Sequence, residues 1–150
     1  MAPDEGFVSE APAPPIATQA TRDVRPKRVV LIDDSAAFAE RWRTLLEDRY
    51  GSKVTFEAYQ DPLKAIPHLG PEIDLLLIDL EIPVLDGRKL AEVAKQRGVT
   101  VRRIVILSGH DANELHSLFP PSSCLAVINK SEPQQQSAFL MILDSIVNKH

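Results

Sequence analysis

The chain has 150 residues, of which 44% are hydrophobic and 25% are charged, which suits one globular domain with a short extension. Its net charge of −4 argues against a nucleic-acid partner, because surfaces that bind DNA or RNA are usually basic. No stretch has the length and apolarity of a transmembrane helix, and the N-terminus lacks the pattern of a signal peptide. The one cysteine, Cys124, cannot form an internal disulfide, so we expect a cytoplasmic protein with no membrane partner.

The N-terminal segment differs in composition from the rest. Residues 1–26 hold five prolines among many Ala, Ser and Thr residues and few large apolar ones. Such a segment cannot bury enough apolar surface to offset the entropy lost on ordering. We therefore expect a disordered Pro/Ala-rich extension over residues 1–26 and a single domain over residues 27–150.

From Lys27 onward, apolar segments alternate with amphipathic ones. The segment at 29–32 is continuously apolar and mostly β-branched, as in a parallel strand that is buried on both faces. The segments predicted as strands are 28–32, 54–58, 73–78, 104–107 and 124–128. Helical spacing and end signals predict helices over 38–51, from 61, over 90–98, over 111–119 and from 133. This order predicts an α/β fold, a doubly wound (βα)₅ domain with a five-stranded parallel sheet.

Polar residues follow four of the predicted strands. They are Asp33 and Asp34 after the first strand, Asp79 after the third, Ser108 after the fourth and Lys130 near the end of the fifth. Ligands of such sheets bind outside the carboxyl ends of the strands, near the point where the strand order reverses. We therefore expect these side chains to share one crevice.

The residue types in this set suit phosphoryl transfer. Three neighbouring carboxylates repel one another and need a cation, and Mg²⁺ prefers oxygen ligands of this kind. A carboxylate such as Asp79 can attack phosphorus to form an acyl phosphate. Lys130, Ser108 and the metal would then neutralise the phosphoryl oxygens, and their movement toward Asp79 would act as a switch.

Each residue also has an ordinary structural explanation. Asp33-Asp34 can cap a helix, Asp79 can be a loop carboxylate, Ser108-Gly109 a tight turn and Lys130 a solvated lysine. We interpret Asp86-Gly87 as a turn without a chemical role. The argument for a site depends on the joint arrival of the set at one sheet edge.

The motifs VVLIDDS, LLLIDLEIPVLDG, VILSG and INK carry a resemblance to a known family. Over residues 27–150 the chain resembles the receiver domain of bacterial two-component response regulators. The second motif is the most specific, since its aspartate, Pro83 and Asp86-Gly87 all fall where the family has them. The resemblance implies a flavodoxin-like fold and a phosphorylation-dependent signalling switch.

The resemblance also assigns roles to single residues. It implies that Asp79 accepts the phosphoryl group, that Ser108 is the switch hydroxyl and that Lys130 pairs with the phosphate. The metal ligands that it implies for Mg²⁺, the family's one cofactor, are Asp33, Asp34, Asp79 and the backbone carbonyl of Glu81.

The partners that the resemblance implies are proteins. The donor would be a histidine kinase or a phosphotransfer protein. Because the chain ends after the fifth predicted helix, we expect no output domain and no enzymatic activity. The family's usual docking face for a downstream target is formed by the fourth predicted helix (111–119), the fifth predicted strand (124–128) and the fifth predicted helix (from 133). A homodimer through the fourth-helix face stays open.

Two positions depart from the family's pattern. Val127 stands where the family usually has the aromatic residue that moves with the switch hydroxyl. Ser131 follows Lys130 where the family usually has a proline in a cis bond, and a cis bond before a residue other than proline costs about 3 kcal/mol. We therefore do not expect the usual aromatic rotation.

Two polar residues stand near the expected phosphoryl group. Glu81 and His110 follow Asp79 and Ser108 by two residues each. We expect them to tune the lifetime of the aspartyl phosphate, although both also suit exposed loop positions.

Two other functions compete with the switch. Phosphatases of the haloacid dehalogenase type also combine a nucleophilic Asp, a hydroxyl, a Lys and Mg²⁺ on a parallel sheet. They place an aspartate two residues after the nucleophile, where this chain has Glu81, and their acidic pair comes late in the sequence. A pseudo-receiver would keep the fold as a binding module without phosphorylation, which the intact acidic set disfavours.

Overall fold

The computed structural model describes residues 25–82, 85–109, 124–130 and 133–148, with only the backbone for 133–135. Nearly all of the expected N-terminal extension lies outside these residues, as do His110, the helix expected over 111–119 and the Lys130-Ser131 peptide. Within the described residues, no helix has the length and apolarity that crossing a bilayer requires.

The strands form one five-stranded parallel sheet in the order β3-β2-β4-β5-β6. Their bounds are β2 Lys27–Ile32, β3 Val54–Tyr59, β4 Leu75–Asp79, β5 Ile104–Ser108 and β6 Ala126–Asn129. The predicted doubly wound fold is therefore confirmed. The chain first moves outward from β2 to β3 and then returns to place β4 on the other side of β2, so the strand order reverses between β2 and β4.

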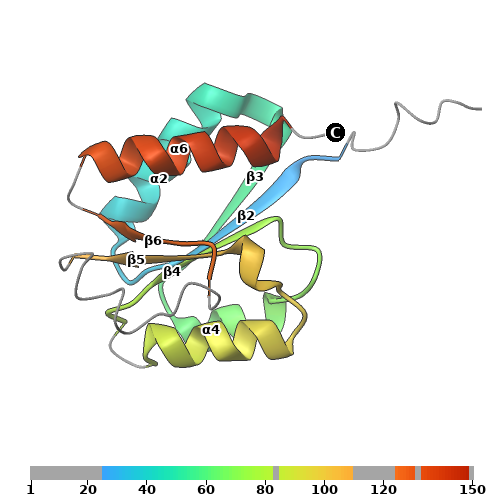
Figure 1. Cartoon of the computed structure of the whole chain (residues 1–150), viewed down its shortest axis with the longest axis vertical. Coiled ribbons are helices and arrows are strands. Elements are labelled where there is room, and N and C mark those ends of the chain that lie inside the picture. The colour runs from blue at the N-terminus through green and yellow to red at the C-terminus, as the bar shows by residue number, and fades with distance from the viewer. Residues whose placement is uncertain (1–24, 83–84, 110–123, 131–132, 149–150) are drawn as a thin grey trace, which may run out of the picture.

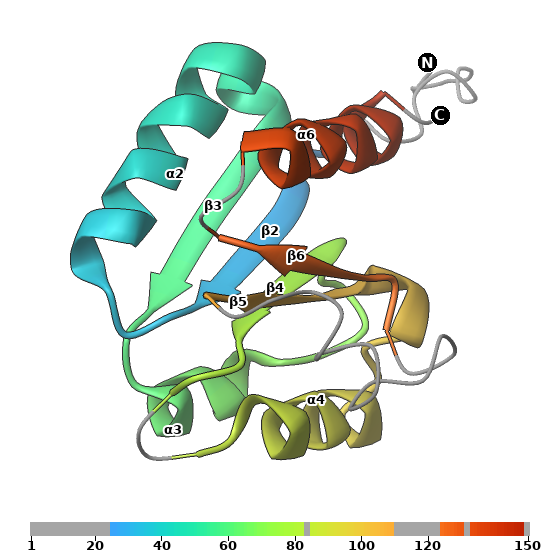
Figure 2. The ribbon, with the colours of Figure 1, turned by 60° about the vertical axis from the view of Figure 1, so that its left-hand side comes forward.

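Helices cover both faces of the sheet (Figures 1 and 2). Helices α2 (Ala36–Tyr50) and α6 (Pro133–Val147) lie on one face, and α3 (Pro62–Ala65) and α4 (Gly87–Gln96) lie on the other. Three short 3₁₀ helices complete the described elements, at Gly51–Lys53, Ile66–His68 and Val101–Arg103. Two faces covered by helices explain why β4 and β5 are buried at every residue.

The core has one layer on each side of the sheet. On the side of α2 and α6, the Phe139 ring meets the Trp42 ring edge-on, with the ring centroids 4.7 Å apart. At the far end of α2, the Tyr50 hydroxyl donates a 2.6 Å hydrogen bond to Asp144 of α6. These contacts fix α6 against α2 on the same face of the sheet.

Local sequence signals explain where the helices begin. Ser35 caps α2 by accepting a hydrogen bond from Phe38 N, and Asp61 caps α3 in the same way. The interpretation of Asp86-Gly87 as a simple turn is wrong in detail. Asp86 is the N-cap of α4, since its side chain accepts a 2.7 Å hydrogen bond from Arg88 N, and Gly87 is the first residue of the helix.

Gly87 lies close to the end of β4, the strand that ends in Asp79. A Cβ atom at this position would stand 2.7 Å from Leu80 Cα and 2.9 Å from the Asp79 carbonyl oxygen. Both neighbours are backbone atoms, which cannot swing away as a flexible side chain would. The start of α4 therefore packs directly against the end of β4, and glycine is what permits this approach.

Candidate functional site

The expected residues gather at the carboxyl edge of the sheet. Asp33 follows β2, Asp79 ends β4, Ser108 ends β5 and Lys130 follows β6. Asp33 and Asp79 thus lie at the carboxyl ends of β2 and β4, the two neighbouring strands between which the strand order reverses. The Lys130 backbone N–H donates a 2.8 Å hydrogen bond to the Ser108 carbonyl, which holds the lysine beside the end of β5.

Three carboxylates lie together at this edge. Asp33, Asp34 and Asp79 each offer a carboxylate oxygen within 4.8 Å of the others. Asp33 is 1% exposed and Asp34 is exposed, so a bound ion would be held from within and reached from solvent. A compact set of hard oxygen donors with an open side fits Mg²⁺, which keeps several water ligands in protein sites.

Asp33 is held in place from two sides. Its Oδ1 accepts a 2.9 Å hydrogen bond from Ser35 N, and its Oδ2 accepts a 2.8 Å hydrogen bond from the Lys130 ammonium. Both partners are donors, so each oxygen of this buried carboxylate is hydrogen-bonded within the protein. The Asp33 side chain is thus oriented before any ligand arrives.

Asp79 lies in the centre of the group and is 3% exposed. Its Oδ1 accepts a 3.0 Å hydrogen bond from Glu81 N, and its Oδ2 lies 3.5 Å from the Lys130 ammonium. Burial raises the pKa of Asp79, the hydrogen bond from Glu81 N opposes this shift, and the charge of Asp33 adds to it. The result is a raised pKa, which means that this environment disfavours the charged carboxylate and that a cation would stabilise it.

Lys130 is the cation of the group. Burial lowers its pKa, but the hydrogen bond to Asp33 and the attraction of Asp33 and Asp79 outweigh burial, so its pKa is raised above 10.5. The amine is therefore protonated at neutral pH. Its ammonium also lies 4.4 Å from the centroid of the Phe38 ring, within range of a cation–π interaction.

Ser108 is fully buried, and its hydroxyl donates a 3.2 Å hydrogen bond to Glu81 Oε2. The next residue, Gly109, donates its backbone N–H to Glu81 Oε1 at 3.4 Å. Val127, at the position expected to depart from the family's aromatic, is half-buried and packs against the core layer on the side of α3 and α4.

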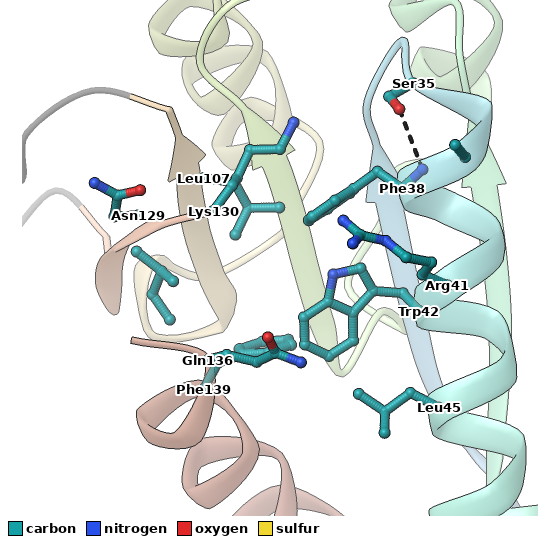
Figure 3. A pocket seen from close by; sticks show the side chains of 12 residues that line it. Ser35, Phe38, Arg41, Trp42, Leu45, Leu107, Asn129, Lys130, Gln136 and Phe139 are labelled. Atoms are coloured by element: carbon teal, nitrogen blue, oxygen red, sulfur yellow. Dashed lines mark hydrogen bonds between the residues drawn. The ribbon is translucent and has the colours of Figure 1, made fainter. Parts of the chain in front are cut away.

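A groove of about 730 Å³ opens beside Lys130, between α2 and α6 (Figure 3). Its wall holds the aromatic rings of Phe38, Trp42 and Phe139, and the Arg41 side chain lies over this wall, with its guanidinium 5.6 Å from the centroid of the Phe38 ring. The groove thus combines an apolar wall with two cations, Arg41 and Lys130, and the Lys130 ammonium lies 3.5 Å from Asp79 Oδ2.

Two features of the site are not predicted by the sequence. The helical spacing indicates Phe38 only as a core residue, although its ring lies against the Lys130 ammonium. The position of Glu81 two residues after Asp79 does not indicate its partners, Ser108 and Gly109. An aromatic residue in the first turn of the helix after the acidic pair was the available signal for Phe38, whereas no sequence signal pointed to the orientation of the Glu81 side chain.

Comparison with known proteins agrees with this geometry. A family model described as the response regulator receiver domain matches residues 29–136. A protein-glutamate methylesterase/protein-glutamine glutaminase of Myxococcus xanthus is 29% identical over 109 residues, which cover 71% of this chain and 31% of that protein. The sensor protein GacS of Pseudomonas syringae is 33% identical over 99 residues, which cover 63% of this chain and 11% of that protein.

A solved structure agrees as well. A response regulator receiver protein from Sinorhizobium medicae superposes with a TM-score of 0.62 at 26% identity, over 84% of this chain and 98% of that one. The chain spans about a third or less of the length of the two curated relatives, whereas it matches the solved receiver almost throughout. With the family match and the shared fold, the chain belongs to the family of response regulator receiver domains, the signalling domains of two-component systems.

Proposed function

We propose that this chain is a phosphorylation-dependent switch that accepts a phosphoryl group on Asp79 from a histidine kinase or a phosphotransfer protein. The observation that supports this best is the environment of Asp79. Asp79 is a buried carboxylate that can act as a nucleophile, and two further carboxylates lie within 4.8 Å of it, which together can bind a cation. The Lys130 ammonium lies 3.5 Å from Asp79 and can pair with a phosphate group.

In the proposed reaction, a carboxylate oxygen of Asp79 attacks the phosphorus of a phosphohistidine. An O–P bond forms, the P–N bond breaks, and the imidazole leaves with the electron pair and takes a proton from solvent. Glu81 N holds Oδ1 of the nucleophile in place, and Lys130 lies on the side of Oδ2.

The metal would be held by Asp33, Asp34, Asp79 and the backbone carbonyl of Glu81, as the family resemblance implies. Bound Mg²⁺ would supply positive charge that offsets both the carboxylates and the transferred phosphoryl oxygens. Lys130 already pairs with Asp33 and lies near Asp79, so a modest movement suffices for it to contact a phosphoryl group.

We propose that the phosphodonor docks over the groove between α2 and α6. The donor must reach Asp79 from the carboxyl edge, and this groove adjoins that edge through Lys130. Its apolar wall and the exposed Arg41 suit a partner surface that combines apolar and acidic side chains.

For the downstream target, or for a second copy of the chain, we propose the family's usual docking face, which is formed by its fourth helix, fifth strand and fifth helix; the strand and the last helix of that face correspond here to β6 and α6. Leu125 and Met141 belong to these elements and their flanks and are 41% and 72% exposed. With Val127 in place of an aromatic, transmission to this face would depend on Ser108, Lys130 and the loops rather than on a rotating ring.

The remaining parts of the proposal follow from the family. The receiver would occupy residues 27–150 behind the 1–26 extension, act in the cytoplasm through protein partners and have no enzymatic activity of its own. Glu81 and His110 would tune the lifetime of the aspartyl phosphate, and loss of either side chain would then change the rate of dephosphorylation.

A phosphorylation assay tests the proposal. The full chain is incubated with Mg²⁺ and acetyl phosphate, or with a cognate kinase, and its intact mass is measured. We expect one added phosphate on the wild type and none on Asp79→Asn. An adduct that survives this substitution would overturn the assignment, absence of any adduct with a kinase would favour a pseudo-receiver, and multiple turnover of p-nitrophenyl phosphate would favour a phosphatase.

A further inference from the structure

The Glu81 side chain contacts the end of β5 with both of its oxygens. Ser108 donates its hydroxyl to Oε2 at 3.2 Å, and Gly109 donates its backbone N–H to Oε1 at 3.4 Å. These two donors come from consecutive residues, and the Ser108 side chain is fully buried while Glu81 is exposed. An acidic side chain from the loop after β4 is therefore bound at the edge of the neighbouring strand.

The backbone of Glu81 contacts Asp79, so the contact between the Glu81 side chain and β5 lies beside the expected phosphorylation site. Glu81 N donates to Asp79 Oδ1 at 3.0 Å, so the backbone of the same residue orients the acceptor aspartate. Ser108 ends the strand that pairs with β4, and Asp79 is paired with Leu107 in that register. The two donors that Glu81 occupies thus stand next to the place where a phosphoryl group on Asp79 would lie.

A carboxylate and a phosphoryl group attract the same partners. Both are anionic oxygen acceptors, and both form charge-assisted hydrogen bonds with hydroxyl and backbone N–H donors. A hydroxyl can donate its single hydrogen to only one of them at a time. The Glu81 carboxylate and a phosphoryl group also carry like charges, which repel at short range.

We propose that Glu81 is a positioning residue whose carboxylate acts as an internal substitute for phosphate, occupying Ser108 Oγ and Gly109 N until a phosphoryl group on Asp79 displaces it. This inference rests on the proposed acceptance of phosphate by Asp79. It concerns the state before phosphorylation and is separate from the effect of Glu81 on phosphate lifetime, since it predicts a change in affinity for a phosphoryl group even where no hydrolysis occurs.

The size of the effect follows from the population of the occupied state. If the carboxylate holds the two donors in most molecules, only the remaining fraction is competent, and the apparent dissociation constant of a phosphoryl analogue rises by the reciprocal of that fraction. A free energy of about 1 kcal/mol for a net hydrogen bond gives a competent fraction of roughly one sixth. We therefore expect Glu81→Ala to bind the analogue about three- to tenfold more tightly.

The probe is beryllofluoride with Mg²⁺, a phosphoryl analogue that does not hydrolyse, and ¹⁹F NMR measures its dissociation constant for the full chain. The matched control is Glu47→Ala, which removes an exposed glutamate from α2, away from the site. We expect wild-type affinity for the control and tighter binding for Glu81→Ala. Equal or weaker binding by Glu81→Ala overturns the inference.

A shorter acidic side chain at position 81 separates the effect of the hydrogen-bond contact from the effect of the negative charge. Glu81→Asp keeps the negative charge but lacks one methylene, so its oxygens fall short of Ser108 and Gly109. Binding close to that of Glu81→Ala supports displacement of a contact, whereas binding equal to that of the wild type shows that charge alone is responsible and overturns the proposed contact.

The Gly109 amide supplies a spectroscopic readout that a merely structural role would not move in this way. In the free chain its NMR chemical shift should differ between wild type and Glu81→Ala, and in the beryllofluoride complex the two shifts should coincide. An unchanged Gly109 amide in the free variant contradicts the inference. Failure of the proposed function looks different, since the wild type would then bind no beryllofluoride or would bind it equally after Asp79→Asn.

Discussion

Repulsion among the three carboxylates at the sheet edge, Asp33, Asp34 and Asp79, should destabilise the metal-free protein. The substitution Asp79→Asn tests this most directly. Asn has the shape of Asp and keeps a carbonyl oxygen that can accept the hydrogen bond from Glu81 N. The substitution therefore removes charge with little change in packing. We expect the variant to be more stable than the wild type without Mg²⁺.

The magnitude follows from the distances. Charges 4.8 Å apart repel by about 3.5 kcal/mol at an effective dielectric constant of about 20, and Asp79 faces two such carboxylates. Its attraction to Lys130 at 3.5 Å is about 5 kcal/mol on the same scale, so repulsion exceeds attraction. Because Asp34 is exposed and screened by solvent, we expect a net gain of about 1–2 kcal/mol. The raised pKa of Asp79, caused first by burial, has the same sign.

Urea unfolding followed by the fluorescence of Trp42, the one tryptophan, measures this gain in EDTA and in MgCl₂. At a concentration ten times its dissociation constant, Mg²⁺ should stabilise the wild type by about 1.4 kcal/mol and the variant by much less. Asp48→Asn, an exposed change on α2, should alter the free energy of unfolding by less than about 0.5 kcal/mol. A variant less stable than the wild type in EDTA, or an equal Mg²⁺ effect on both, would refute the reasoning.

Three further substitutions test other parts of the structure by equilibrium unfolding. Phe38→Leu removes the ring beneath the Lys130 ammonium and should cost about 1–2 kcal/mol, whereas no loss would exclude a stabilising cation–π contact. Gly87→Ala places a methyl group against the backbone at the end of β4 and should cost about 1–3 kcal/mol; a neutral result would mean that the start of α4 shifts freely. Glu57→Gln should cost about 0.5–1 kcal/mol at neutral pH, because the hydrogen bond from Arg28 lowers the pKa of Glu57. A lowered folded-state pKa stabilises above the unfolded value of about 4.5, so the difference should vanish as the pH falls through the folded-state pKa, and a difference that persists there would contradict the assignment.

Much of the fold could be predicted because its signals are local. Apolar runs such as 29–32 and 104–107 can be buried on both faces only in a parallel sheet that helices cover. Parallel strands joined by helices end at the same edge, so residues that follow the strands must gather there. The neighbourhood of Asp33, Asp79, Ser108 and Lys130 was therefore predictable from their places along the chain.

Boundaries and caps were less predictable. The third strand begins at Leu75, two residues after the start of the predicted segment, because Ile73 lies in the preceding turn although it is fully buried. Aspartate is common both in turns and at helix N-caps, so the residue type of Asp86 does not distinguish the two structures. The packing of Gly87 against β4 decides that Asp86 is a helix N-cap.

Taken by itself, the sequence determined the parallel sheet and the edge of the sheet at which the acidic, hydroxyl and cationic residues meet. Tertiary structure alone decided which oxygen pairs with which donor: Glu81 with Ser108 and Gly109, and Lys130 with Asp33 above the Phe38 ring. The physical reason is that the apolar pattern of a strand fixes the residue at which the strand ends to within one or two positions. A hydrogen bond depends on a side-chain rotamer and a few tenths of an ångström between segments far apart in the chain, and packing sets both.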